Sequence, residues 1–461
     1  MDELIIEKSF NMKRRFFDDG NTRSYDFRIT QLKKLKTVIK KNEKEILEAL
    51  YLDLHKSAFE AFTSEIGIIY EEINFTINHL KSWMSLEKVP VPIVLLPSKG
   101  YIYSEPLGVA LIIGPWNYPF QLLFAPLIGA ISSGNCAMLK PSDQSKHISN
   151  LVSKIISETF QEEYVSVVQG PGAMLGPMLI DKFRFDHIFF TGSAAIGRKI
   201  LAMASNHLTP VTLELGGKSP VIVHKDANID VAAKRITWSK YFNAGQTCVC
   251  PDYLLIHESI KDEFLDKMKF YIKEFFGDKP IESESFGRII NEKRFDILKG
   301  LFDEGDIIIG GESDRDSNFI SPTIIDGINV DSKIMKEEIF GPILPVITYK
   351  DIHEVLDIVR RNRYPLALYL YTKNKDIENF ILENIEFGGG CINNGLVHLA
   401  NSTLPFGGVG NSGMGSYHGK CSFDVFSHKK SILKTGEWLD PPLRYAPYSK
   451  LKLDIAKKFF K

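Results

Sequence analysis

The chain has 461 residues, of which 44% are hydrophobic and 25% are charged, and its 56 basic and 57 acidic side chains give a formal net charge of -1. These proportions are typical of globular proteins and exclude a disordered, collagen-like or disulfide-scaffold chain. Because the basic excess of a nucleic-acid binder is missing, we expect no nucleic-acid partner and favour a small-molecule enzyme of about three domains.

Three features of the sequence indicate the cellular compartment. Residues 1–17 are charged throughout and contain no apolar stretch, so we expect no signal peptide. The long apolar run at 107–139 is broken by prolines and polar residues, which a membrane-spanning helix tolerates poorly. The five cysteines are odd in number and widely spaced, unlike a disulfide framework. We therefore expect a cytoplasmic protein.

The first half of the chain changes character near residue 107. Residues 28–85 repeat apolar side chains at steps of three and four, which predicts helices. The proline-punctuated residues 86–106 predict extended hairpin arms. Short apolar runs then alternate with helical patterns, which predicts a parallel α/β sheet. Its expected strands are 107–113, 136–141, 165–170 and 187–192.

A second α/β region begins near Lys218, and a lysine-rich tail follows Gly436. The tail places Leu451, Ile455 and Phe459 on one helical stripe. Packing of that stripe on its own or a partner subunit is favoured over contact with an anionic membrane surface, which stays open as the alternative. The strands expected in the second region are 219–224, 252–257, 306–310 and 342–349, with a helix at 261–276.

Three motif-like matches are rejected on their context. The glycines of 408–413 satisfy the pattern G-x-G-x-x-G, but no strand precedes them and no helix follows. Residues 217–219 resemble the end of a phosphate-binding loop but lack its earlier glycine. Cys248 and Cys250 have no matching His/Cys pair nearby, so we expect no zinc site and no other metal.

A better candidate for a phosphate site is the strand-to-helix turn at Gly192 and Ser193. Ser193 can cap a helix that begins with small residues, and a helix N-terminus offers free N–H groups and a positive dipole end. An ordinary turn between a strand and a helix remains the alternative.

Three residues are candidates for catalysis. Cys248 lies in a small, glycine-containing segment and as a thiolate would attack a carbonyl, although Cys250 competes for this role and a buried structural cysteine is the alternative. Glu214 stands between two leucines, where burial would raise its pKa and make it a base, unless a nearby Lys or backbone N–H pairs with it. The Asn117 amide could stabilise an oxyanion or could close its own turn.

These residues fall within ordered motifs that resemble the NAD(P)-dependent aldehyde dehydrogenase superfamily along nearly the whole chain. The short N-terminus, the TCVCPDY form and the RYAPYSK tail are similar to its class 3 branch, which includes fatty and aromatic aldehyde dehydrogenases. The motifs are, in order, LGVALIIGPWNYPF and its continuation to KPS (107–142), FTGSAAIG (190–197), LELGGKSP (213–220), FNAGQTCVCPDY (242–253), EEIFGPILPV (337–346) and LPFGGVGNSGMG (404–415).

The resemblance implies a covalent reaction. Cys248 would attack the aldehyde to give a thiohemiacetal, whose oxyanion the Asn117 amide and the Cys248 backbone N–H would hold. Hydride would pass to the nicotinamide, and Glu214 would activate the water that hydrolyses the thioester. Because coenzyme A-acylating members generally lack this glutamate, hydrolysis is favoured. Coenzyme A acylation and a non-enzymatic member, which would be expected to lack Cys248 or Glu214, are the alternatives.

The resemblance also implies the binding residues. Cofactor contacts would come from Trp116, Lys140, Asp143, Gly192, Ser193, Gly197, Glu338 and Phe340. Tyr118 and Thr247 would line the tunnel of an aliphatic or aromatic aldehyde. Asp143 stands where the family often has Glu, which leaves the choice between NAD and NADP open. Cys250 usually appears as Ala, and we hypothesise that it can link to Cys248 under oxidation.

The implied architecture is α/β, with a Rossmann-like cofactor domain, a second α/β catalytic domain, and an arm that joins two subunits into a homodimer. The expected boundaries are 1–85 and 107–213 for the cofactor domain, 214–410 for the catalytic domain, 86–106 and 421–433 for the arm, and 434–461 for the C-terminal tail.

Overall fold

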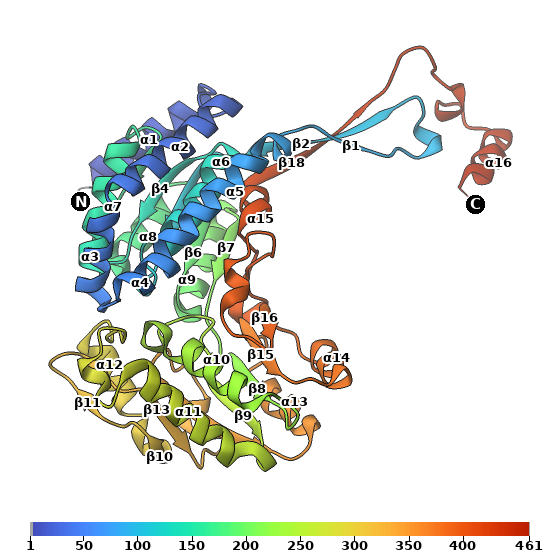
Figure 1. Ribbon diagram of the computed structural model, residues 1–461. Coiled ribbons are helices and arrows are strands. Elements are labelled where there is room, and N and C mark those ends of the chain that lie inside the picture. Colours follow the sequence, from blue (N-terminus) through green and yellow to red (C-terminus); the bar gives the residue numbers. More distant parts are fainter. Residues whose placement is uncertain (1–2, 461) are drawn as a thin grey trace.

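The computed structural model describes residues 3–460 as two α/β lobes and a long arm that projects from the upper lobe (Figure 1). Met1, Asp2 and Lys461, which the expected first and last segments include, lie outside the described residues. The prediction of an α/β fold with a Rossmann-like sheet and a second α/β unit is confirmed.

The upper lobe begins with helices that cover one side of its sheet. Helix α1 was not predicted, because its many charged residues hide a narrow apolar stripe that buries Ile6 and Phe10. A π-helical turn, η1, interrupts the helical run between α4 and α5. The bounds are α1 (Glu3–Asp18), α2 (Tyr25–Lys41), α3 (Glu43–Leu54), α4 (Ala58–Ala61), η1 (Phe62–Ile66) and α5 (Gly67–Trp83).

The six-stranded sheet of the upper lobe has the order β17-β7-β6-β3-β4-β5. All neighbours are parallel except β17, which joins β7 antiparallel. The chain order reverses between β3 and β6, and ligands bind such sheets outside the carboxyl ends of the strands at this point. The bounds are β3 (Val109–Ile113), α6 (Gln121–Ser133), β4 (Cys136–Lys140), α7 (Lys146–Thr159), β5 (Val165–Val167), α8 (Gly172–Lys182), β6 (His187–Thr191), α9 (Ala194–Ala204), β7 (Val211–Glu214) and β17 (Gly413–Met414).

The lower lobe contains a seven-stranded sheet of order β10-β13-β14-β9-β8-β15-β16, parallel except for β10 at its edge. A two-stranded ribbon of β11 and β12 lies beside it. The bounds are β8 (Pro220–Val223), α10 (Ile229–Tyr241), β9 (Tyr253–His257), α11 (Lys261–Phe276), α12 (Glu292–Lys299), β10 (Asp306–Ile309), β11 (Ser313–Asp314), β12 (Phe319–Ile320), β13 (Thr323–Asp326), β14 (Ile343–Tyr349), α13 (Ile352–Arg361), β15 (Ala367–Tyr371), α14 (Lys375–Asn384) and β16 (Gly389–Ile392).

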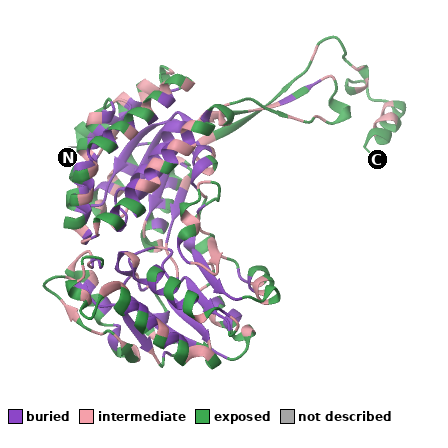
Figure 2. Ribbon diagram, in the orientation of Figure 1, coloured by how far each residue is buried: buried purple, intermediate pink, exposed green. Residues whose placement is uncertain are grey.

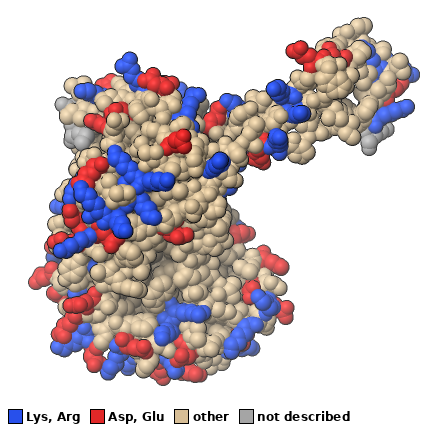
Figure 3. Space-filling view, turned by 45° about the horizontal axis from the view of Figure 1, so that its top comes forward, with Lys and Arg blue, Asp and Glu red and all other residues tan. Residues whose placement is uncertain are grey.

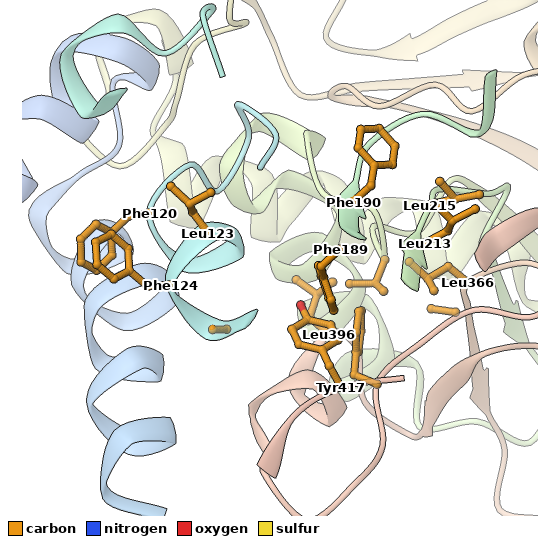
Figure 4. Packing of buried hydrophobic residues seen from close by; sticks show 14 of the residues in the cluster. Phe120, Leu123, Phe124, Phe189, Phe190, Leu213, Leu215, Leu366, Leu396 and Tyr417 are labelled. Carbon is orange, nitrogen blue, oxygen red and sulfur yellow. The ribbon is translucent and has the colours of Figure 1, made fainter. Parts of the chain in front are cut away.

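The central strands of both lobes are buried along their whole length, as expected for parallel strands that helices cover on both faces (Figure 2). In the upper lobe, Phe120 and Phe124 stack with ring centroids 4.3 Å apart. Phe189 packs against Tyr417, with ring centroids 5.1 Å apart (Figure 4). This contact fixes the returning C-terminal segment against β6. On the surface, acidic and basic side chains are interspersed over both lobes and the arm (Figure 3).

The arm is a three-stranded antiparallel sheet of β1 (Glu87–Val89), β2 (Lys99–Pro106) and β18 (Ser427–Lys434). The predicted second segment, 421–433, therefore begins too early, because residues up to 425 form α15 (Gly419–Val425). Phe423 of this helix is buried and contacts the Trp83 ring, which holds α15 on the lobe instead of in the arm.

The C-terminal tail lies at the far end of the arm and includes α16 (Lys450–Phe459), which buries no residue (Figure 1). Within residues 3–460, no helix has the length and apolar character needed to cross a membrane.

Candidate active site

A pocket of about 150 Å³ is formed by residues of both lobes around Cys248. The segments that contribute to it are far apart in the sequence, since they include the turn η1, the loop after β3, the end of α10 and the chain near residue 400. Its apolar and aromatic lining comprises Ile68, Leu122, Trp238, Phe242, Val249, Leu396, Val397, Leu399, Phe406 and Tyr417. The pocket therefore suits an apolar ligand that presents a reactive group to the thiol.

Cys248 follows a sharp turn at the end of α10. Asn243 and Ala244 adopt left-handed backbone conformations with φ of 53° and 50°, which redirects the chain toward the pocket. Cys248 is partly exposed. Desolvation raises the pKa of its thiol, and the nearby charges of Glu338 and Glu214 add to this shift. The group is therefore a thiol at rest, and a base must remove its proton before it can attack.

Glu214 is the last residue of β7 and pairs in register with Gly413 of β17. Glu214 is 2% exposed, and neither of its carboxylate oxygens has a hydrogen-bond partner among the described residues. Burial raises the pKa of this carboxyl well above its usual range. The alternative expected from the sequence was a carboxylate paired with a nearby Lys or backbone N–H. The structure shows instead a carboxyl that is desolvated and unpaired.

Asn117 lies in the loop after β3 and is tied to the segment that carries Cys248. Its side-chain Nδ2 donates to the Gln246 carbonyl at 3.0 Å, and its own carbonyl accepts from Asn243 Nδ2 at 2.9 Å. An asparagine amide has two N–H donors, so one remains for a ligand. Sequence reasoning missed Asn243 and Gln246, although both are polar residues inside the motif around Cys248.

Tyr118 and Thr247, predicted to line the tunnel, both line the pocket. Their hydroxyl oxygens are 2.6 Å apart, so one donates to the other. This bond joins the loop after β3 to the residue that precedes Cys248.

Lys140, the last residue of β4, has a buried ammonium beside the N-terminus of α8. A Cβ atom on Gly172 would lie 3.3 Å from Lys140 Nζ, so the glycine leaves the space beside the ammonium open. The half-exposed Asp143 places Oδ1 3.8 Å from Nζ. Burial lowers the pKa of Lys140, and Asp143 acts against that shift.

The turn from β6 into α9 carries Gly192, Ser193 and Gly197. Ser193 is the N-cap residue, but its side chain makes no capping hydrogen bond, so the helix N–H groups are available to an anion. Gly197 is buried, and a Cβ atom there would lie 2.7 Å from Leu215 Cδ2. Its position is therefore dictated by helix–strand packing, whereas Gly192 and Ser193 lie at the exposed turn.

Glu338 and Phe340 approach from the lower lobe. Burial raises the pKa of Glu338 to about 8, with the Asp252 charge adding to the shift, while the Gly217 N–H donates to the carboxylate and opposes it. Phe340 adopts a left-handed φ of 50° and places its ring edge-on to Trp116, with centroids 5.4 Å apart. Trp116 follows β3, so this contact joins the lower lobe to the sheet of the upper lobe.

The donors and acceptors in this crevice fit a dinucleotide. A lysine ammonium and free helix N–H groups suit phosphates, a carboxylate suits ribose hydroxyls, and these groups lie at the carboxyl ends of the parallel strands β4 and β6. The glycines of 408–413 lie in a short turn that leads into β17, in agreement with the rejection of that match. Within residues 3–460, no group of three or more His, Cys, Asp or Glu side chains is arranged to hold a metal ion.

Comparisons with known proteins match the chain over nearly its whole length. The sequence profile of the aldehyde dehydrogenase family matches residues 6–432. The chain is 46% identical over 459 residues to the 4,4'-diaponeurosporen-aldehyde dehydrogenase of Staphylococcus aureus, covering 99% of both proteins. It is 43% identical over 428 residues to an aldehyde dehydrogenase of Rattus norvegicus named dimeric and NADP-preferring, covering 93% of this chain and 94% of that protein. A solved structure of Staphylococcus aureus AldH in a substrate-bound state has a TM-score of 0.97 at 46% identity and covers 100% of both chains.

Proposed function

Because the chain belongs to the aldehyde dehydrogenase family, in its class 3 branch, and oxidises an aldehyde to the carboxylic acid with NAD or NADP, we propose that Cys248, Asn117 and Glu214 perform the chemistry. The observation that carries this assignment is the buried, unpaired carboxyl of Glu214, which lies near enough to Cys248 to raise the pKa of its thiol. Neighbouring groups with perturbed pKa values are typical of active sites.

In the first step, the ionised form of Glu214 accepts the proton of the Cys248 thiol, the sulfur bonds to the aldehyde carbon, and the carbonyl π electrons move to oxygen to give an alkoxide. The free N–H of the Asn117 amide and the Cys248 backbone N–H stabilise that alkoxide. A donor of this kind is worth about 10² to 10³ in rate. Forming the adduct matters because a negatively charged oxygen promotes the loss of hydride from the same carbon.

NAD or NADP, held by Lys140, Ser193 and Glu338, supplies the hydride acceptor when bound. The acyl group then remains on Cys248 as a thioester. Glu214, once it has released its proton to solvent, takes a proton from water, and the water oxygen attacks the thioester carbon. The carbon–sulfur bond then breaks to release the acid, and the Cys248 thiolate that leaves takes the proton back from Glu214. The raised pKa of Glu214 makes it a stronger base than an exposed glutamate, and this supports hydrolysis over transfer to coenzyme A.

We propose an apolar aliphatic or aromatic aldehyde as the substrate. The apolar and aromatic walls of the pocket support this class, and so does the similar Staphylococcus aureus protein, which is named for an aldehyde of diaponeurosporene.

The test is the absorbance of the reduced nicotinamide, with NAD or NADP, a panel of aliphatic and aromatic aldehydes, and coenzyme A added or omitted. We expect turnover without coenzyme A and none in Cys248→Ala. Turnover that requires coenzyme A would contradict the role of Glu214. Unchanged turnover in Cys248→Ala would contradict the covalent scheme.

We also propose a homodimer assembled through the arm, with α16 packed on the partner subunit. Exposed apolar side chains at the end of the arm, among them Ile93, Leu96 and Trp438, support this, as does the rat relative named dimeric. Light scattering of the intact chain and of Leu96→Asp tests the dimer. Co-sedimentation with anionic vesicles, compared with a truncation at Tyr448, tests the tail, since loss of pelleting on truncation would favour a membrane contact.

The proposed location is the cytoplasm, and the five free cysteines support a reducing compartment. Cell fractionation with an antibody to the protein tests this, and recovery in an extracellular or membrane fraction would contradict it.

A further inference from the structure

A buried ion pair that the proposed chemistry does not use lies beneath the pocket. Lys56 Nζ is 2.6 Å from Glu65 Oε1, and both side chains are 0% exposed. Neither side chain lines the pocket. Replacing a buried ion pair with apolar side chains is often neutral for stability, so its other contacts are informative about its role.

The remaining hydrogen bonds of this pair converge on the loop that carries Asn117. Lys56 Nζ donates to the Asn117 carbonyl at 2.9 Å. Glu65 Oε2 accepts from the backbone N–H groups of Phe120 at 2.9 Å and Gln121 at 3.0 Å. One partner therefore holds the middle of the loop, and the other holds its end, where α6 begins.

The local structure around Glu65 places it for these contacts. Glu65 belongs to the π-helical turn η1, and such turns are frequent at functional sites because they redirect side chains within a helix. The ammonium of Lys56 also lies 4.0 Å from the centroid of the Tyr118 ring, which fixes the residue that follows Asn117.

The same region also reaches the segment that carries Cys248. Glu60 Oε1 accepts from the Asn243 backbone N–H at 3.0 Å, and Asn243 Nδ2 donates to the Asn117 carbonyl. The Asn117 carbonyl thus receives one hydrogen bond from each side, from Lys56 and from Asn243. Losing either donor would remove one of the two hydrogen bonds that fix the Asn117 carbonyl and would loosen the backbone from which the side-chain amide projects.

We propose that Lys56 and Glu65 are positioning residues that aim the Asn117 amide at the oxyanion. The inference rests on the proposed role of Asn117 and assigns the pair an effect on the chemical step and not on aldehyde binding. A displacement of about 1 Å in a catalytic group can cost about 10² in rate, so a misdirected amide loses most of its benefit.

The test compares Lys56→Met and Glu65→Gln with the control Lys13→Met. Lys13 is equally buried and donates to the Glu162 carbonyl at 2.6 Å, but its hydrogen bonds go to Ser9 and Glu162 and not to the loop that carries Asn117. With turnover counted per titrated Cys248 thiol, we expect kcat to fall about 10- to 100-fold in Lys56→Met while the aldehyde KM changes less than threefold. Lys13→Met should keep the wild-type kcat even if its melting temperature falls.

If Lys56→Met fails to fold, Glu65→Gln still tests the inference, because its amide oxygen can accept from the backbone N–H groups of Phe120 and Gln121. We expect a smaller fall in kcat, again with KM nearly unchanged. A kcat within twofold of wild type in both variants, or an equal fall in Lys13→Met, would overturn the inference.

A double-mutant cycle separates this inference from the proposed function. If Asn117→Ala alone leaves kcat unchanged, the proposed oxyanion role fails. If Asn117→Ala lowers kcat, Lys56→Met added to it should lower kcat no further, because the amide it positions is gone. Losses that multiply would show that Lys56 acts independently of Asn117 and would overturn the inference.

Discussion

Replacing Glu214 with glutamine should stabilise the protein relative to the native chain, by an amount that grows as the pH rises. The Glu214 carboxyl is buried without a partner, and burial raises its pKa well above the ordinary 4.5. Between these two values the folded protein keeps a proton that the unfolded chain has released. The free energy of unfolding of the native protein therefore falls with rising pH, by about 1.4 kcal/mol per pH unit for one proton.

Glutamine does not titrate, so Glu214→Gln removes this slope. Relative to the native protein, its unfolding free energy should increase by about 1.4 kcal/mol per pH unit above pH 5, up to the pKa of the folded state. The variant should at the same time lose steady-state turnover and accumulate an acylated Cys248, which intact-protein mass spectrometry detects. Stability and catalysis thus move in opposite directions at one residue.

The assay is urea unfolding of both proteins at pH 5, 6, 7 and 8, with Glu158→Gln as the control. Lys41 and Asn42 hold the pKa of Glu158 below its usual range, so this carboxylate is ionised in both states above pH 5. Its replacement should shift stability by the same amount at every pH. Parallel stability curves for the native protein and Glu214→Gln would refute the reasoning, since Glu214 would then ionise alike in the folded and unfolded states.

Four further variants test other parts of the site and core. Asn117→Ala should lower kcat by about 10² to 10³ with little change in KM, measured by steady-state kinetics. Phe124→Ala, which removes a fully buried ring, should lower the free energy of unfolding by about 3–5 kcal/mol in denaturant titrations. Glu338→Gln should move the pH dependence of Cys248 alkylation to lower pH, because the charge of Glu338 contributes to the raised pKa of the Cys248 thiol. The Cys250 sulfur lies 3.4 Å from two backbone carbonyls, either of which can accept its S–H, and burial raises its pKa to about 11, so Cys250→Ala should keep native turnover and native sensitivity to peroxide. Protection by this variant would instead support the hypothesised link to Cys248.

The buried parallel strands were predictable because each is a short, continuous apolar run closed by glycine or proline. The runs at 107–113 and 187–192 correspond to β3 and β6, and their short length favours a strand over a buried helix. The start of β18 was mispredicted because the sequence around Phe423 contains no breaker between α15 and the arm.

The candidate site was predictable where chemistry demands one residue type in a motif, as at Cys248 and Glu214. The groups that support it were not, since Lys56 and Asn117 are 61 positions apart and meet only in the folded chain. Nor does any local pattern distinguish the buried Glu65 from the many exposed glutamates of the helical region. Tertiary contacts of this kind carry no signal in sequence periodicity.

The pairing of β17 with β7 also constrains how the protein is made. Glu214 closes the first pass of the chain through the upper lobe, but its neighbour Gly413 emerges from the ribosome only after the whole lower lobe. The nascent upper lobe therefore has an open sheet edge at Glu214, the residue that we propose activates water. Domains usually fold in order of synthesis, and here that order places completion of the active site near the end of translation. A chain stopped before residue 413 would contain both Cys248 and Glu214 and still lack the strand that encloses the glutamate.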